Sequence, residues 1–463
     1  MVPIPDGPAT ALDQLYLTLR PEPLEKPEEF RKFYRAEVNE VRGEDTVARL
    51  SSRLQQSFGA LPFRAFVMGH PGVGKSTEIS RLLQRVKDQH VGVRLSVATE
   101  LNPASFKVFD ILLLMLARLA ETAKDLNAIP FQGDRSEALV RDITQWFANE
   151  QTRNSRTRTT GAEVVAGVKE GSLWATVFGL FGSAKAEMKY AAERKTETIE
   201  YRLQRLPDLI DLCNKLIDLS GETLREKTGK EWLLVVEDLD KSVISPQQLQ
   251  DLFIQYGAVF ENLRVSTIFT IPVWLAYSPE AIRLPGERYM IHDTPVYDQQ
   301  HNPHEKGRAA VQKVLEARAS PSLFDHGQMM RLIVASGGNL RDLFSLVSEA
   351  GERARLRNPP ASLIGPDDAK AAIGKMRGEY TRRLGQSPYD MKEIPYSAKS
   401  SRLVGVYNSA PDNEIPDPVL YSLLRGRAIQ EFNGDVWFGV HPLVVDILKE
   451  QQHLKPQDRG GTY

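Results

Sequence analysis

Glycines, a lysine and a serine follow one another in this chain at a spacing that suits phosphate binding. The stretch 64–83 reads RAFVMGHPGVGKSTEISRLL, which satisfies the pattern G-x-x-x-x-G-K-S between an apolar run and a helix-like run. The backbone N–H groups of such a loop can surround a triphosphate, and side chains at Gly72 or Gly74 would block that approach. The ammonium group of Lys75 can reach the β- and γ-phosphates, and the Ser76 hydroxyl can bind Mg²⁺. We therefore predict an ATP-binding loop made of Gly69, His70, Pro71, Gly72, Val73, Gly74, Lys75, Ser76 and Thr77.

A pair of acids stands at the end of a second apolar run. Residues 230–240 read KEWLLVVEDLD, so that Glu237 and Asp238 come directly after four apolar residues. In a site that follows such a loop, acids at a strand end complete the Mg²⁺ shell and polarise the attacking water. We predict that Glu237 is a metal-binding and catalytic residue and that Asp238 is catalytic.

Two further polar residues suit a phosphate sensor. Thr270 ends the apolar run 264–271, where its hydroxyl would touch the γ-phosphate or the water, or else would be an ordinary satisfied strand-end hydroxyl. Arg341 lies in ASGGNLRDLF, residues 335–344, in which Asn339 is a good N-cap. A cation in the first turn opposes the helix dipole, so its placement needs another reason, and contact with a phosphate supplies one. The alternative is an exposed arginine paired with Asp342.

The elements that must position these residues alternate between strands and helices. Apolar or alternating runs at 64–68, 91–97, 233–236, 264–271 and 288–294 predict strands. We expect an α/β fold with a parallel sheet and the site at the carboxyl ends of its strands. Helices follow residue 305, and the C-terminal part combines helix 418–426, the hairpin turn Asn433-Gly434 and helix 443–450, as in a winged helix.

Length and composition agree with a protein of several domains. The 463 residues predict about three domains, and 41% hydrophobic and 26% charged residues are typical of a globular protein. We divide the chain into a helical lead-in (1–60), a P-loop NTPase core (61–300), a helical lid (301–385) and a winged-helix-like domain (386–463). The net charge of −1 gives no general attraction to nucleic acid or membranes. One cysteine, Cys213, and an N-terminus without a basic and apolar leader favour the cytoplasm.

An insertion at about 131–200 is harder to interpret. Within 151–184, a polar, basic segment precedes the apolar run LWATVFGLFG at 173–182, which glycines interrupt. A loop with a hairpin, a partner-binding surface and a membrane-touching segment are all open. The run is too short to span a bilayer, as is the apolar run 111–120, so we expect a loop or hairpin and no membrane span.

Taken together, GHPGVGKST, VVEDLDK and SGGNLRDL resemble the additional-strand P-loop ATPases, nearest the STAND and KAP groups, which are related to AAA+ proteins. The resemblance runs from about residue 44 to residue 380. It implies that Lys75 and Ser76 hold ATP and Mg²⁺, that Glu237 and Asp238 prepare water, and that Arg341 senses the γ-phosphate. Relatives usually place aspartate first in the acidic pair, so the resemblance also implies slow hydrolysis. An arginine acting on a neighbouring subunit would be Arg283, Arg288 or Arg318.

Two functions from different classes follow. The first is an ATP-driven switch or oligomerising regulator, of the kind that bacterial anti-phage systems use with a separate effector. The second is a nucleic-acid-bound ATPase anchored by the winged helix, whose Arg402, Arg425 and Arg427 we expect to be exposed but diluted by neighbouring acids. A phosphotransferase fits less well, because the sequence offers no acceptor site.

Overall fold

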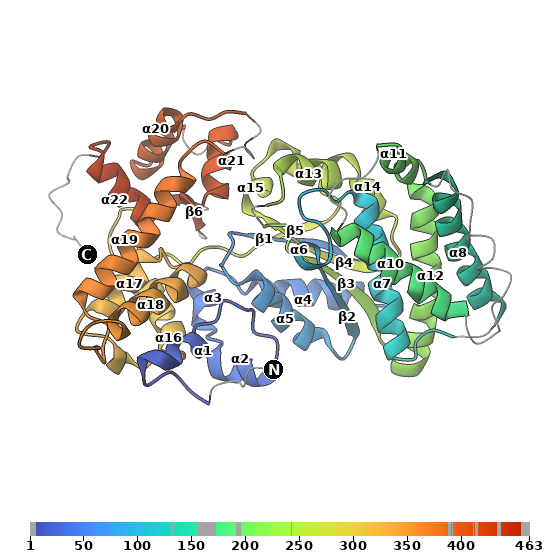
Figure 1. The fold of residues 1–463 in the computed structure, drawn as a ribbon, viewed down its shortest axis with the longest axis horizontal. Helices are drawn as coiled ribbons and strands as arrows, with labels where there is room; N and C mark the ends of the chain where they lie inside the picture. The colour runs from blue at the N-terminus through green and yellow to red at the C-terminus, as the bar shows by residue number, and fades with distance from the viewer. Residues whose placement is uncertain are drawn as a thin grey trace.

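The computed structural model describes residues 6–130, 133–154, 173–190, 196–241, 243–387, 390, 392–410, 412, 415–432 and 437–454. A parallel sheet lies near the middle of the molecule, with a helical bundle at one end and the lid and C-terminal helices at the other (Figure 1). The α/β fold class predicted from the sequence is confirmed.

Five parallel strands form the sheet, in the order β2-β3-β4-β1-β5. They are β1 (Arg64–Gly69), β2 (His90–Ser96), β3 (Glu231–Glu237), β4 (Ser266–Pro272) and β5 (Glu287–Met290). Strand β4 pairs with both β1 and β3, so one strand separates the loop after β1 from the acids that end β3. This is the strand arrangement of the additional-strand P-loop class. It brings the carboxyl ends of all three strands to one edge of the sheet.

Helices cover both faces of the sheet because the central strands are apolar on both sides. On one face, α4 (Thr46–Ser57) and α5 (Lys75–Val86) bury Leu50, Leu54 and Ile79 against β1 and β3. On the other face, α7 (Val108–Asp125) contacts β2 and α12 (Leu206–Thr228) contacts β3. The loop that follows β1 is therefore fixed between a buried strand and a buried helix.

The insertion folds as part of a helical bundle. Its helices α8 (Asp134–Asn154), α10 (Leu173–Tyr190) and α11 (Thr196–Gln204) pack with α7 and α12. Our expectation of a loop or hairpin at 173–182 is wrong. Trp174, Val177 and Phe181 are buried at helical spacing, whereas Gly179 and Gly182 face outward, where they do not break the helix. The rest of the basic segment, 155–172, lies outside the described residues.

No helix among the residues that the structure describes is long and apolar enough to cross a membrane. Cys213 is buried in α12, as expected, and burial raises the pKa of its thiol to about 12.

The N-terminal lead-in packs mainly on the lid rather than on an edge of the core, as we had expected. Helices α1 (Leu15–Thr18) and α3 (Glu37–Val41) contact α18 (Leu340–Arg355) and α16 (Glu305–Glu316), respectively. The segment between them, which includes α2 (Pro27–Phe33), passes the start of α5, where the Leu24 N–H donates to Thr77 Oγ1 at 3.2 Å. The lead-in therefore connects the lid to the loop after β1.

Lid and C-terminal helices follow the sheet. The lid contains α16, α17 (Gln328–Ala335), α18 and α19 (Pro366–Arg383). The C-terminal part contains α20 (Tyr396–Tyr407), α21 (Pro418–Arg425), β6 (Ile429–Phe432), β7 (Trp437–Val440) and α22 (Pro442–Glu450). Antiparallel pairing of β6 with β7 confirms the expected hairpin, although its turn, Asn433-Gly434, lies outside the described residues. The domain boundaries given above stay predictions.

Short helical segments complete the path of the chain. They are η1 (Leu12–Gln14), α6 (Val97–Glu100), α13 (Pro246–Gln250), η2 (Asp251–Gln255), α14 (Gly257–Glu261), α15 (Val273–Ala276), η3 (Pro279–Arg283) and η4 (Pro321–Leu323).

Candidate functional site

The loop after β1 has the backbone that phosphate binding requires. Gly69, Gly72 and Gly74 have φ values of 153°, 90° and 106°, which a residue with a side chain rarely adopts. Helix α5 begins at Lys75, directly after this turn. The loop thus directs the positive end of a buried helix toward whatever lies above it.

Lys75 is held inside the loop and paired with an acid. Its ammonium group donates to the carbonyl oxygens of Gly69 and His70 at 2.7 and 2.9 Å and lies 2.7 Å from Asp240 Oδ2. Burial lowers the pKa of Lys75, and the charge of Asp240 opposes that shift. Asp240 is therefore the counter-charge of the loop lysine in this state, a role that we did not predict from the sequence.

Glu237 lies at the end of β3 and is 6% exposed. Its Oε2 accepts from Arg94 Nε at 2.7 Å and lies 2.6 Å from Arg94 Nη2. Burial raises the pKa of Glu237, although Arg94 and the nearby Ser76 hydroxyl act against the shift. Among the described residues, Oε1 is buried without a hydrogen bond of ordinary geometry. A buried carboxylate oxygen beside Ser76 is a suitable ligand position for a hard cation.

Asp238 is held from three sides. Its backbone has a positive φ of 69°, and its N–H donates to Thr270 Oγ1 at 3.1 Å. The Ser96 hydroxyl donates to one carboxylate oxygen, and Lys241 Nζ lies 3.1 Å from the other. Thr270 is 2% exposed and supports the turn that carries Asp238, so its placement agrees with the strand-end alternative. Its predicted contact with phosphate stays a prediction.

Arg341 comes to the loop from the lid. A Cβ atom added at Gly72 would stand 2.4 Å from Asn339 Oδ1 and 2.7 Å from the Cβ of Arg341, so the start of α18 touches the loop. Within the described residues Arg341 forms no ion pair, which rules out the pairing with Asp342 that we weighed as its alternative role. Its charge is close enough to lower the pKa of Lys75, after the larger effect of burial.

A cavity of about 820 Å³ joins these groups. Its lining includes the loop from Gly72 to Thr77, both acids of the predicted pair, Asp240 and Arg341, but not Gly69, His70, Pro71 or Thr270. The N-terminal segment forms the opposite wall with Pro21–Glu25, Tyr34 and Asn39. Core, lid and lead-in therefore enclose one site, large enough for a nucleotide.

The arginines considered for a neighbouring subunit lie in different surroundings. Arg283 and Arg288 are exposed, as a contact between subunits requires. Arg318 is 7% exposed and lies between the rings of Phe33 and Phe344 in the cavity of its own chain. Its burial removes Arg318 from the candidates.

Three polar residues of the site were missed in the sequence. Arg94 and Ser96 lie two residues apart on β2, so both point to one face, and β2 pairs with β3 in a register that sets Ser96 beside Glu237. The alternation of 91–97 carried this signal, but the order of the strands was needed to read it. Asp240 was named only as a neighbour of the acidic pair.

No protein-family model matches this sequence, and no curated protein matches it. Among solved structures, the chain is similar to Cdc6p from Pyrobaculum aerophilum, at 13% identity and a TM-score of 0.35 over 88% of this chain and 93% of that one. It is similar to a Walker-type ATPase of Pyrococcus abyssi, at 11% identity and a TM-score of 0.40 over 93% and 99%. It is also similar to the RuvB Holliday junction branch migration motor of Thermotoga maritima, at 10% identity and a TM-score of 0.35 over 95% and 100%. These scores are low, so the assignment to an AAA+-like P-loop NTPase fold rests on the loop and the strand order of the chain itself.

Proposed function

We propose that this chain binds ATP with Mg²⁺, hydrolyses it slowly, and uses the nucleotide as a conformational switch. The observation that carries the proposal is the position of Arg341. A lid arginine without an ion pair faces the loop lysine across a cavity that also contains the acidic pair. Such an arrangement distinguishes a nucleotide with a γ-phosphate from one without it, because only the former brings charge to Arg341.

The residues present fit this ligand. The loop between Gly72 and Gly74 leaves room for phosphate oxygens, and Lys75 supplies a cation. The Ser76 hydroxyl and the buried Oε1 of Glu237 are oxygen ligands of the kind that Mg²⁺ takes. When bound, Mg²⁺ would neutralise phosphate charge. Asp238, oriented by its Ser96 and Lys241 contacts, would hold the proton of the attacking water.

Internal ion pairs in the site support a switch. Lys75 is paired with Asp240, and Glu237 is paired with Arg94, so the groups that would hold ATP and metal are occupied by residues of the chain itself. A nucleotide must displace these pairs to bind. The exchange of partners would move the loop after β3, which carries Asp238 and Asp240, relative to the loop after β1.

The biological setting is proposed from sequence motifs alone. The resemblance to STAND and KAP proteins suggests an oligomerising regulator in bacterial defence, with the effector on a separate partner. The nucleic-acid alternative has lost its basic residues. Arg402 pairs with Asp417 at 14% side-chain exposure, Arg425 is half-buried and reaches the Ile244 carbonyl, and Arg427 is 8% exposed. Our expectation that these arginines are exposed is wrong.

The test compares nucleotide affinity and assembly across matched variants. We expect the wild-type protein to bind a slowly hydrolysed ATP analogue more tightly than ADP and to change oligomeric state or shape with the bound nucleotide. Arg341→Ala should bind ADP normally but lose most of the preference for the triphosphate. Arg353→Ala is the control, because Arg353 lies on the same helix and pairs with Glu349 on the surface. Equal affinities for both nucleotides in the wild type would contradict the switch, and turnover stimulated by DNA or RNA would favour the alternative.

A further inference from the structure

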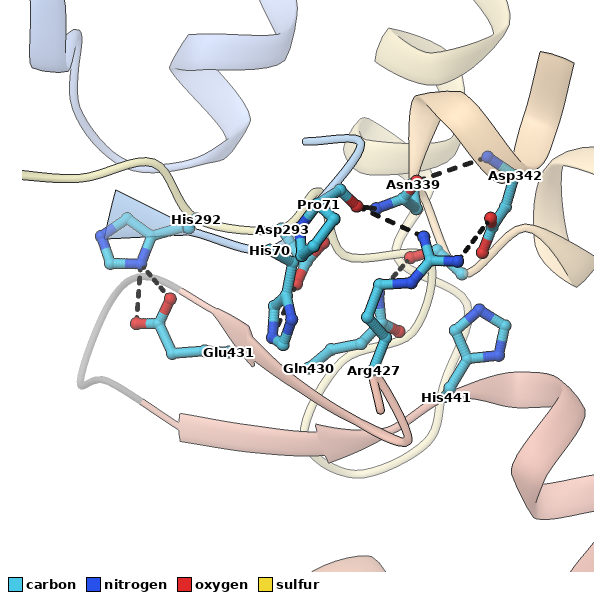
Figure 2. Close-up of polar contacts among 12 residues, drawn as sticks. His70, Pro71, His292, Asp293, Asn339, Asp342, Arg427, Gln430, Glu431 and His441 are labelled. Atoms are coloured by element: carbon cyan, nitrogen blue, oxygen red, sulfur yellow. Dashed lines mark hydrogen bonds and ion pairs between the residues drawn. The ribbon is translucent and has the colours of Figure 1, made fainter. Parts of the chain in front are cut away.

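Arg427 occupies an unusual place between α21 and β6. It is the second residue after α21, and its backbone has a positive φ of 59°, which is costly for a residue with a side chain. The guanidinium is turned into the molecule, toward the loop after β1 and the start of α18 (Figure 2). A surface arginine would need neither the strained backbone nor the burial.

Two contacts join Arg427 to the site. Its Nη1 donates to the carbonyl oxygen of Pro71 at 3.3 Å, and its Nη2 donates to Asp342 Oδ1 at 2.8 Å (Figure 2). Asn339 Nδ2 donates to the same carbonyl oxygen of Pro71 at 3.0 Å. One carbonyl of the phosphate-binding loop is therefore shared by the first residue before α18 and by the C-terminal part of the chain.

Asp342 depends on this contact for its charge. It is 4% exposed, and burial alone would raise the pKa of its carboxyl group, but the pKa is lowered, most of all by the charge of Arg427. Its other oxygen accepts from the Tyr380 hydroxyl at 2.7 Å. Since Asp342 follows Arg341 in the sequence, the anchor of Asp342 fixes the first turn of α18, which carries the guanidinium that faces the loop.

The C-terminal part also holds the turn before α18. Gln430 Nε2 donates to the Gly337 carbonyl oxygen at 2.9 Å, and the ring of His441 lies 3.2 Å from the Ser336 carbonyl oxygen. A Cβ atom added at Gly337 would stand 2.7 Å from the His441 ring, so the turn and the C-terminal part are in close contact. The path from the C-terminal hairpin to Arg341 is thus continuous and buried.

We propose that Arg427 is a positioning residue for the nucleotide site, which sets the place of Arg341 through Asp342 and the place of the loop through Pro71. The proposal rests on the function proposed above, in that it assigns the link between γ-phosphate sensing and the C-terminal domain. A closed lid keeps Arg427 on both partners. A lid that opens with ADP must separate Asp342 or Pro71 from Arg427 and so move the C-terminal domain.

The experiment is a double-mutant cycle on nucleotide preference, measured in the full-length chain as the ratio of the ADP dissociation constant to that of a slowly hydrolysed ATP analogue. We expect Arg427→Ala to lower the ratio by roughly tenfold, as Arg341→Ala does, because a charged hydrogen bond and its buried partner are lost. The double variant should then lower it no further, since both changes remove one interaction. Arg427→Lys should restore part of the ratio by keeping one charged contact with Asp342.

Arg402→Ala is the matched control, because it removes an arginine–aspartate pair that lies wholly within the C-terminal domain. It should leave the ratio unchanged. Independent, additive effects of Arg427→Ala and Arg341→Ala would overturn the proposal, and so would an unchanged ratio in Arg427→Lys and Arg427→Ala. If the wild type itself shows no preference for the ATP analogue, the proposed function fails instead.

Discussion

The pair between Lys75 and Asp240 gives a quantitative test of the site. The two side chains are 5% and 10% exposed and 2.7 Å apart. Burial alone would raise the pKa of Asp240, but the charge of Lys75 lowers it, so both groups are ionised in the folded protein. The substitution Asp240→Asn keeps the shape of the side chain and removes its charge, leaving Lys75 without a counter-charge.

The expected cost follows from burial and from the remaining contacts. Removal of one partner of a buried ion pair costs about 3–5 kcal/mol. Lys75 keeps its hydrogen bonds to Gly69 and His70, so we expect a loss at the lower end, about 3 kcal/mol in the free energy of unfolding without nucleotide. MgATP should offset part of this loss, because its phosphates supply the missing charge and no longer compete with Asp240.

The assay is denaturant unfolding with and without saturating MgATP. We expect the nucleotide to stabilise Asp240→Asn by about 1.4 kcal/mol more than it stabilises the wild type, which corresponds to about tenfold tighter binding. Glu222→Gln is the control, since its pair with Arg135 is exposed and should contribute under about 1 kcal/mol. Weaker binding of MgATP by Asp240→Asn would refute this reasoning and would make Asp240 itself part of the ligand shell.

Three other changes test single contacts. Gly72→Ala, with φ at 90° and a Cβ atom 2.4 Å from Asn339 Oδ1, should push the lid from the loop and weaken MgATP binding roughly tenfold in an equilibrium titration. Arg94→Ala removes the cation that opposes the raised pKa of Glu237, so the acid limb of the turnover profile should move to higher pH. Burial raises the pKa of Asp293 to about 6 from 3.8, so the wild type should lose stability relative to Asp293→Asn as pH rises from about 4 to 6. The loss should reach about 3 kcal/mol by thermal unfolding and stay constant above that range.

Strands and the phosphate-binding loop were readable because their sequence signals are local. The run from Arg64 to Gly69 is apolar and the glycines follow at fixed spacing, so the strand, turn and helix could be assigned without tertiary information. Helix α10 was not readable, because Gly179 and Gly182 look like breaks until the packing of Trp174 and Phe181 shows which face is buried. Helix propensity is a weak signal that tertiary contacts override.

Side-chain direction was the information that the sequence did not contain. Arg427 was counted as a surface charge because arginine is usually exposed. Its burial follows from the packing of the C-terminal hairpin against the turn before α18, which joins residues more than 85 positions apart. Asp240 escaped notice for a similar reason, since only the folded loop after β3 shows that it, rather than Glu237, pairs with Lys75.

The most direct test of the central claim is a binding titration of MgATP against the wild type and Lys75→Ala, with folding of the variant checked by thermal unfolding. A folded variant is secured by the double substitution Lys75→Ala with Asp240→Asn, which leaves no unpaired buried charge. We predict saturable binding by the wild type and none by either variant at the same nucleotide concentrations. Equal affinity of the wild type and both folded variants for MgATP would contradict the assignment of this cavity as the nucleotide site.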